Sequence, residues 1–273
     1  MKTTFILFAA LLGICALVGS CQKDENPDAF SATDKNSVTL EFDNRVGGQN
    51  LILGQSIAKN TSGEDFTVTK LNYFISNVAL TKDDGTVVKF PDSYFLIREA
   101  DPQSLLAKLP DVPAGNYKEV SFVVGVDSAR SVANVAARTG VLDVASYGDD
   151  GMYWSWNSGY IFMKLEGTSP VVPLRASGQR LFEIHVGGFG GYSGPAPNNL
   201  RRVTLPVGSE LAKVRKDVAP EIHFYVDAAK ILDGKTKISL ATTNNIHSPS
   251  LAKPVADNYT EMFAVDHVHN EKQ

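Results

Sequence analysis

The sequence predicts an all-β domain, an immunoglobulin-like β-sandwich of antiparallel strands with a few short helices. Apolar and polar residues alternate over many short runs, as in residues 38–43. This period of two is typical of a strand with one buried face. Turn-forming pairs such as Asp84-Gly85 and Asp233-Gly234 lie between such runs. Many short strands separated by turns, with few helical segments, favour a sandwich.

The same alternation, together with β-branched and aromatic residues, predicts the other strands. They are expected at residues 66–80, 86–90, 94–97, 117–126, 159–165, 181–186, 202–207, 221–226 and 237–241. Short helices are expected at residues 104–109, 128–136 and 254–263. The sequence shows no repeat of fixed period and no linker-like tract after residue 36. Residues 37–273 are therefore expected to form one domain.

Residues 1–20 have the pattern of a bacterial lipoprotein signal peptide. Lys2 supplies the positive start, and residues 5–18 form an apolar run that is shorter than the ~20 residues needed to span a bilayer. Residues 17–21, Leu-Val-Gly-Ser-Cys, then match a lipobox, in which the cysteine is acylated after cleavage. We therefore expect Cys21 to anchor the protein in the outer membrane.

A polar tether is expected at residues 21–36, after the anchor. Lysine followed by two acidic residues at 23–25 resembles the export signal of surface lipoproteins in Bacteroidetes, so the domain is expected at the cell surface or facing the periplasm. Cys15 leaves with the signal peptide, so the mature domain has no thiolate for a metal site. Histidine, carboxylate, methionine or a modified residue must hold any metal ion.

The composition and motifs exclude several functional classes. The formal net charge is only −4 and the basic residues are scattered, which argues against nucleic-acid binding. Nucleophile elbows, zinc-protease motifs, phosphate-binding loops and dinucleotide fingerprints are absent from the sequence. Asp127 and Asp143 are interpreted as turn or cap residues rather than a catalytic pair. We therefore expect a binding protein and not an enzyme.

Five histidines are available as metal ligands. His185 and His223 both end a Glu-Ile-His run on a predicted strand, where they point away from the apolar face. Imidazoles from separate strands can converge on one ion, and imidazole is a suitable ligand for copper or zinc. The alternative is that each of these histidines is simply exposed to solvent. His267 and His269 would face the same side if their segment is extended, with a frayed terminus as the alternative. His247 lies in a polar loop, a common setting for sites.

The two tryptophans lie two residues apart in the most aromatic stretch of the chain, residues 151–167. Side chains alternate along a strand, so Trp154 and Trp156 are expected on one face. That face is a packed core, a recognition surface or a chemical site.

Five motifs occur in a fixed order along the chain. They are Leu-Asn-Tyr-Phe-Ile-Ser-Asn-Val at 71–78, Val-Pro-Ala-Gly-Asn-Tyr at 112–117, Gly-Val-Asp-Ser at 125–128, Trp-x-Trp-x-x-Gly-Tyr at 154–160 and Phe-Glu-Ile-His-Val-Gly-Gly at 182–188. This series resembles the MbnP-like copper-binding proteins, a family found beside methanobactin genes in methanotrophs and as lipoproteins in Bacteroidetes. The resemblance covers nearly the whole mature domain.

The resemblance implies a secreted β-rich domain that binds copper. It also implies that Trp154 or Trp156 can be oxidised to kynurenine by a partner di-haem enzyme related to cytochrome c peroxidases, and that His185 is the leading ligand. Some members have a histidine shortly before the tryptophan pair, where residues 147–151 of this chain contain none. Further ligands, chosen on their chemistry alone, are His223, His247 and His267.

Two alternatives to copper binding stay open. In the first, Trp154, Trp156, Tyr153 and Tyr160 form an aromatic face that recognises a glycan or a protein partner. In the second, both indoles fill the core of the sandwich.

Overall fold

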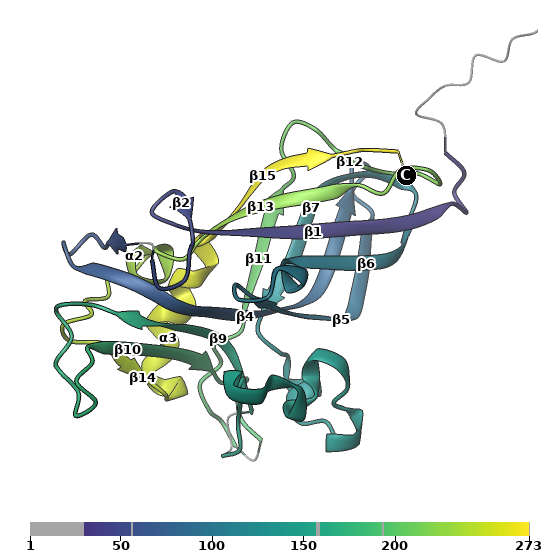
Figure 1. Ribbon diagram of the computed structural model, residues 1–273. Helices are drawn as coiled ribbons and strands as arrows, with labels where there is room; N and C mark the ends of the chain where they lie inside the picture. The colour runs from purple at the N-terminus through teal and green to yellow at the C-terminus, as the bar shows by residue number, and fades with distance from the viewer. Residues whose placement is uncertain (1–29, 56, 157–158, 193, 273) are drawn as a thin grey trace, which may run out of the picture.

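Two curved β-sheets share one apolar core in the computed structural model, which describes residues 30–55, 57–156, 159–192 and 194–272 (Figure 1). The smaller sheet lies at the top of Figure 1 and has β1 and β13 as its centre. These two strands run parallel, whereas β15 and β6 are antiparallel to their neighbours. In order, the smaller sheet contains β15 (Phe263–His269), β13 (Glu221–Asp227), β1 (Lys35–Val46) and β2 (Gln49–Asn50), with β6 (Leu106–Pro113) also paired to β1.

The larger sheet is organised by β4, whose two ends pair with different strands. Its first part, from Thr67 to Tyr73, pairs with β9, and its later part, from Asn72 to Thr81, pairs with β5. In order, this sheet contains β11 (Arg201–Pro206), β7 (Gly115–Val124), β4 (Asp65–Lys82), β9 (Gly159–Thr168), β10 (Leu181–Gly187) and β14 (Asn245–Ile246). The strands beside this path are β3 (Ile57–Lys59), β5 (Val87–Arg98), β8 (Tyr153–Trp154) and β12 (Ala212–Val214).

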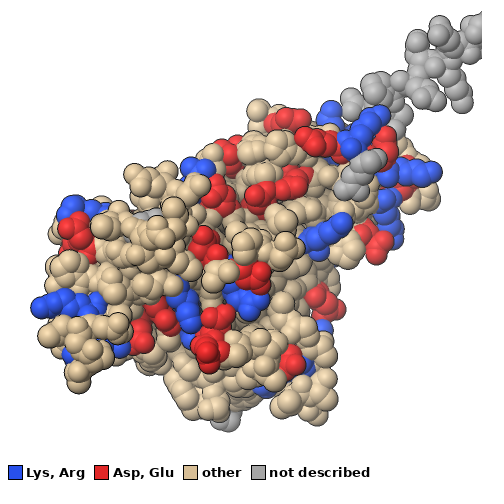
Figure 2. All heavy atoms as spheres, viewed as in Figure 1, with Lys and Arg blue, Asp and Glu red and all other residues tan. Residues whose placement is uncertain are grey.

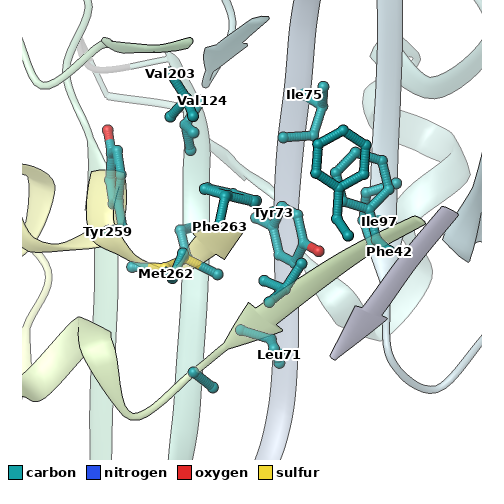
Figure 3. Close-up of a cluster of buried hydrophobic side chains, with 14 of the residues drawn as sticks. Phe42, Leu71, Tyr73, Ile75, Ile97, Val124, Val203, Tyr259, Met262 and Phe263 are labelled. Atoms are coloured by element: carbon teal, nitrogen blue, oxygen red, sulfur yellow. The ribbon is translucent and has the colours of Figure 1, made fainter. Parts of the chain in front are cut away.

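The inner faces of the two sheets meet in an aromatic core (Figure 3). Phe42 of β1 stacks on Phe224 of β13 with ring centroids 5.1 Å apart, and Phe122 of β7 meets Phe263 of β15 edge-on at 5.1 Å. Tyr73 enters from β4, and a hydrogen bond satisfies its buried hydroxyl. Since a fully buried aromatic side chain contributes about 1.5–3 kcal/mol, this cluster fixes how the sheets pack.

The connection from β7 to β8 is mostly helical and packs on the outer side of β4 and β9. Tyr147 of this connection meets Phe74 of β4 edge-on at 6.3 Å, and Leu142 accepts a hydrogen bond from the Tyr160 hydroxyl of β9. These residues belong to a second apolar cluster that includes Trp154. The helices of the connection are α1 (Ser128–Ser131), η2 (Val135–Ala137), η3 (Gly140–Leu142) and η4 (Val144–Asp150).

The structure confirms the predicted sandwich and most of its strands. The cap roles are also confirmed, because Asp127 accepts a hydrogen bond from the backbone N–H of Arg130 at the start of α1, and Asp143 accepts one from Ala145 at the start of η4. The strands expected at residues 86–90 and 94–97 are one strand, β5. Two strand pairs, β1 with β13 and β10 with β14, are parallel rather than antiparallel.

The helix expected at residues 104–109 is wrong. A single 3-10 turn, η1 (Pro102–Leu105), precedes strand β6. Ala107 and Leu109 are buried while Leu106 and Lys108 are exposed, a period of two that only a strand satisfies.

Three predictions near the C-terminus also need correction. Residues 237–241 form no strand, because Glu64 binds the backbone N–H groups of Leu240 and Ala241. Asp233-Gly234 ends the short helix α2 (Lys230–Asp233) instead of making a hairpin turn. The helix expected at residues 254–263 begins earlier, at Pro249. It is observed as α3 (Pro249–Asn258) and η5 (Tyr259–Glu261), after which Phe263 starts β15.

Candidate metal centres

The structure divides the five histidines between the two sheets. His185 and His247 lie together on the larger sheet, with ring centroids 4.3 Å apart. His223, His267 and His269 lie together on the smaller sheet. The four predicted ligands His185, His223, His247 and His267 therefore belong to two sites and cannot share one ion.

His185 occupies the outer face of β10, opposite Lys164 of β9. Its side chain is only 7 % exposed, and its Nε2 lies 2.8 Å from Glu166 Oε1. Its Nδ1 is buried and finds no hydrogen-bond partner in the part of the chain that the structure describes. Because an unpaired buried nitrogen is costly, this atom marks a position where a ligand would be stabilised.

Burial lowers the pKa of His185, and the nearby Lys164 and His247 act in the same direction, although the hydrogen bond to Glu166 opposes them. The imidazole is therefore neutral at pH 7, the form that binds metal ions. When Nε2–H donates to Glu166, the lone pair is on Nδ1. This pairing with a carboxylate is the usual arrangement behind a histidine ligand.

His247 reaches the site from the residue after β14. Ile246 of β14 pairs with Ile184 of β10, so the next residues, His247 and His185, are neighbours. His247 is half exposed, and its Nε2 lies 3.7 Å from Glu183 Oε2. Each imidazole of this pair thus has a carboxylate neighbour, Glu166 beside His185 and Glu183 beside His247.

The tryptophan pair lies on the same face of this sheet. Trp154 of β8 is 9 % exposed and packs against Gly187, two residues beyond His185 on β10. A Cβ atom at position 187 would lie 2.5 Å from Trp154 Cζ3, so only glycine allows this approach. Trp156 stacks on Trp154 with centroids 5.0 Å apart and is 50 % exposed.

The shared face of the two indoles is confirmed, but its cause differs from the prediction. Strand β8 ends at Trp154, and a turn rather than an extended strand brings Trp156 onto its neighbour. Tyr160 is fully buried and Tyr153 half buried, so Trp156 is the main exposed ring of this aromatic group. One indole therefore lies in a core, and the other faces solvent.

Sequence reasoning missed the carboxylates that complete each cluster. The Glu166 side chain of β9 contacts His185 of β10, and Glu41 of β1 lies beside His223 of β13. Both lie on the polar faces of alternating strands, but only the strand pairing shows which histidine each one meets.

A sequence profile of the MbnP family matches residues 35–248. The chain belongs to the MbnP family. The match includes the two tryptophans, His185 and His247, whereas His267 and His269 lie beyond it. No curated protein matched the sequence.

The MbnP fold is also seen in a solved structure, MbnP from Methylosinus trichosporium. The two chains are 15 % identical and superpose with a TM-score of 0.52, over 85 % of this chain and 98 % of the other. At this identity the likeness shows the fold. None of the helices in the described part of this MbnP protein has the length and apolar character that a membrane crossing needs. The predicted signal peptide and Cys21 lie outside the described residues.

Proposed function

We propose that this protein is an extracytoplasmic copper-binding lipoprotein, anchored in the outer membrane through Cys21, with a copper site formed by His185 and His247 beside Trp154. This proposal rests mainly on the buried Nδ1 of His185, which has no hydrogen-bond partner among the described residues and whose ring lies beside that of His247. Membership of the MbnP family supports copper as the ion.

The residues of this site fit copper. Neutral imidazole is a preferred ligand of copper, which also tops the affinity order of divalent first-row metals. Glu166 holds the orientation of His185, and the indole of Trp154 packs against Gly187 on the same strand. Two imidazoles leave a coordination position open for a further donor.

A kynurenine made from Trp154 is a suitable further donor, because its aniline nitrogen and ketone would lie beside the strand that carries His185. Its formation needs a partner enzyme, here a di-haem protein related to cytochrome c peroxidases, that passes on the oxidising equivalents of peroxide. The indole C2–C3 bond breaks, each of these carbons gains an oxygen, and hydrolysis releases C2 as formate. The role of this protein in that reaction is that of a substrate and not of an enzyme.

Copper titration of a matched set of variants tests the proposal. We expect His185→Ala and His247→Ala each to weaken copper binding at this site by at least about tenfold, since even residues that only support a ligand have effects of this size. Lys118→Ala, which shortens an exposed side chain on β7, serves as a control. If His185→Ala left copper affinity unchanged, His185 would not be a ligand of the copper site.

A second candidate function is recognition of a glycan or protein partner. The exposed ring of Trp156, backed by Trp154, favours it, because stacked aromatic rings bury large apolar areas on binding. Loss of glycan binding in Trp156→Ala, with copper affinity unaltered, would support this alternative.

A further inference from the structure

The outer face of the smaller sheet brings three histidines and two glutamates together. One ligand atom from each of His223, His267 and His269 lies within 4.8 Å of the others, and the same holds for Glu41, Glu221 and His223. This group, called here the triple-histidine cluster, lies on β1, β13 and β15, away from the tryptophan pair and His185.

Strand register creates the cluster. Glu41 pairs with His223 across the parallel strands β1 and β13, and His223 pairs with His267 across β13 and β15. Two residues further along these strands, on the same face, Glu221 pairs with His269. All five side chains lie opposite the apolar residues of the same strands, so they meet on the solvent side without disturbing the core.

Distances in the cluster suit a small metal ion. The Nε2 atoms of His267 and His269 are 3.0 Å apart, and His223 Nε2 lies 3.3 Å from Glu221 Oε1. A tetrahedral ion with metal–nitrogen bonds of about 2.0–2.1 Å holds two ligand nitrogens about 3.3 Å apart. The three histidines therefore need little movement to bind one ion, and Glu221 lies beside one of them.

Two further features leave these nitrogens available for binding. Asp266 Oδ2 lies 2.6 Å from His267 Nδ1, which leaves His267 Nε2 to face the cluster. A histidine ligand is typically held in this way by a carboxylate on its other nitrogen. His223 Nε2 is buried and makes no hydrogen bond to any residue within the described ranges.

The charges of the metal-free cluster also favour a cation. The carboxylates of Glu41 and Glu221 both lie beside His223, 3.1 Å and 3.3 Å from its ring nitrogens. Acidic side chains, red in Figure 2, lie over the surface formed by β1, β13 and β15. A divalent cation would relieve the repulsion between these carboxylates.

We propose that His223, His267 and His269, together with Glu221, form a second metal site that binds Zn²⁺ or Cu²⁺. Three imidazoles and one carboxylate are donors for these ions, whereas Mg²⁺ and Ca²⁺ take oxygen ligands. An open cavity of about 380 Å³ beside His223 and His269 gives the ion access from solvent. His267 and His269 lie beyond the residues that the family profile matches.

The site is tested by counting the ions bound to the whole mature protein. Zn²⁺ and Cu²⁺ are titrated separately into the wild type, into the double variant His267→Ala/His269→Ala and into the double variant His185→Ala/His247→Ala. Both His267 and His269 are exposed, so their loss leaves the fold intact, which circular dichroism checks. We expect the His267/His269 variant to lose one bound ion, with an affinity at that site at least about 100-fold lower.

The two proposals fail separately. Loss of an ion in the His267/His269 variant alone would support the triple-histidine cluster and remove the copper site at His185. Loss in the His185/His247 variant alone would overturn the triple-histidine cluster as a metal site. Electron paramagnetic resonance of the Cu²⁺ form of the His185→Ala/His247→Ala variant adds a direct readout, because three equatorial imidazole nitrogens are expected there and fewer than three would contradict the assignment.

Discussion

His185 and His247 lie with their rings 4.3 Å apart because two short segments pair in parallel, Ile184 of β10 with Ile246 of β14. The contact joins a buried imidazole, whose Nδ1 has no partner among the described residues, to a half-exposed one. The pair thus offers a ligand that is fixed and neutral and a second that can adjust to an incoming ion.

Glu166→Gln tests whether Glu166 positions His185. The amide keeps the shape of the side chain but loses the charge that orients the imidazole, so copper affinity should fall by about 10–100-fold. Isothermal titration measures it. Glu119→Gln, which alters a β7 carboxylate that accepts a hydrogen bond from Thr81 of β4, should leave affinity unchanged. Equal affinities for the Glu166 variant and the wild type would show that Glu166 does not support the ligand.

Gly187→Ala tests the packing of Trp154 on β10. The added Cβ would lie 2.5 Å from Trp154 Cζ3 and 2.9 Å from the carbonyl oxygen of Tyr160, so the indole must move. Such overpacking costs about 1–3 kcal/mol of unfolding free energy, measurable by urea denaturation. Gly194→Ala is the matched control, because its Cβ meets no described atom within 4 Å. A stable variant with unshifted Trp154 fluorescence would argue against the close approach.

Fluorescence distinguishes the two indoles. Trp156→Phe leaves Trp154, whose emission should be blue-shifted and protected from iodide because the ring is 9 % exposed. Trp154→Phe leaves Trp156, whose emission should be red-shifted and readily quenched. Two equally protected indoles would instead place both in the core.

Glu64 should give the protein a pH-dependent stability. Burial alone would raise the pKa of this carboxyl, but hydrogen bonds from neighbouring groups outweigh burial and hold its pKa below the usual range. A carboxyl with a lowered pKa stabilises the folded state above its unfolded pKa, and this contribution disappears as the pH falls through the folded value. The donors are Asn60, Ser239, Leu240 and Ala241.

Urea denaturation from about pH 7 to about pH 3 measures this contribution. Glu64→Gln should lower the free energy of unfolding at neutral pH by about 1–3 kcal/mol, because hydrogen bonds to a charged group are lost. The difference between variant and wild type should shrink in acid. A constant difference across the pH range would assign the loss to packing rather than to ionisation.

The sequence predicted the strands whose alternation is regular, because burial on one face of a sheet leaves a period of two. It could not predict β14, which has only two residues and exists because β10 offers it an edge. Residues 237–241 show the opposite error. Ile238 and Leu240 are buried as in a strand, but Glu64 and not a neighbouring strand binds the backbone N–H groups of Leu240 and Ala241.

The same limit applies to the sites. Local patterns correctly placed His185 and His223 on polar strand faces and His267 with His269 on one side. They could not show that β13 pairs with β15 while β10 pairs with β14, and this pairing separates the histidines into two groups. Long-range strand pairing is decided by the whole core rather than by the residues of the site.

Anomalous scattering at the copper edge, from crystals of the mature protein grown with copper, tests the central claim most directly. A copper peak is expected within bonding distance of His185 Nδ1 and of a ring nitrogen of His247, beside the residue derived from Trp154. A map with density for the protein but no anomalous peak between His185 and His247 would contradict it.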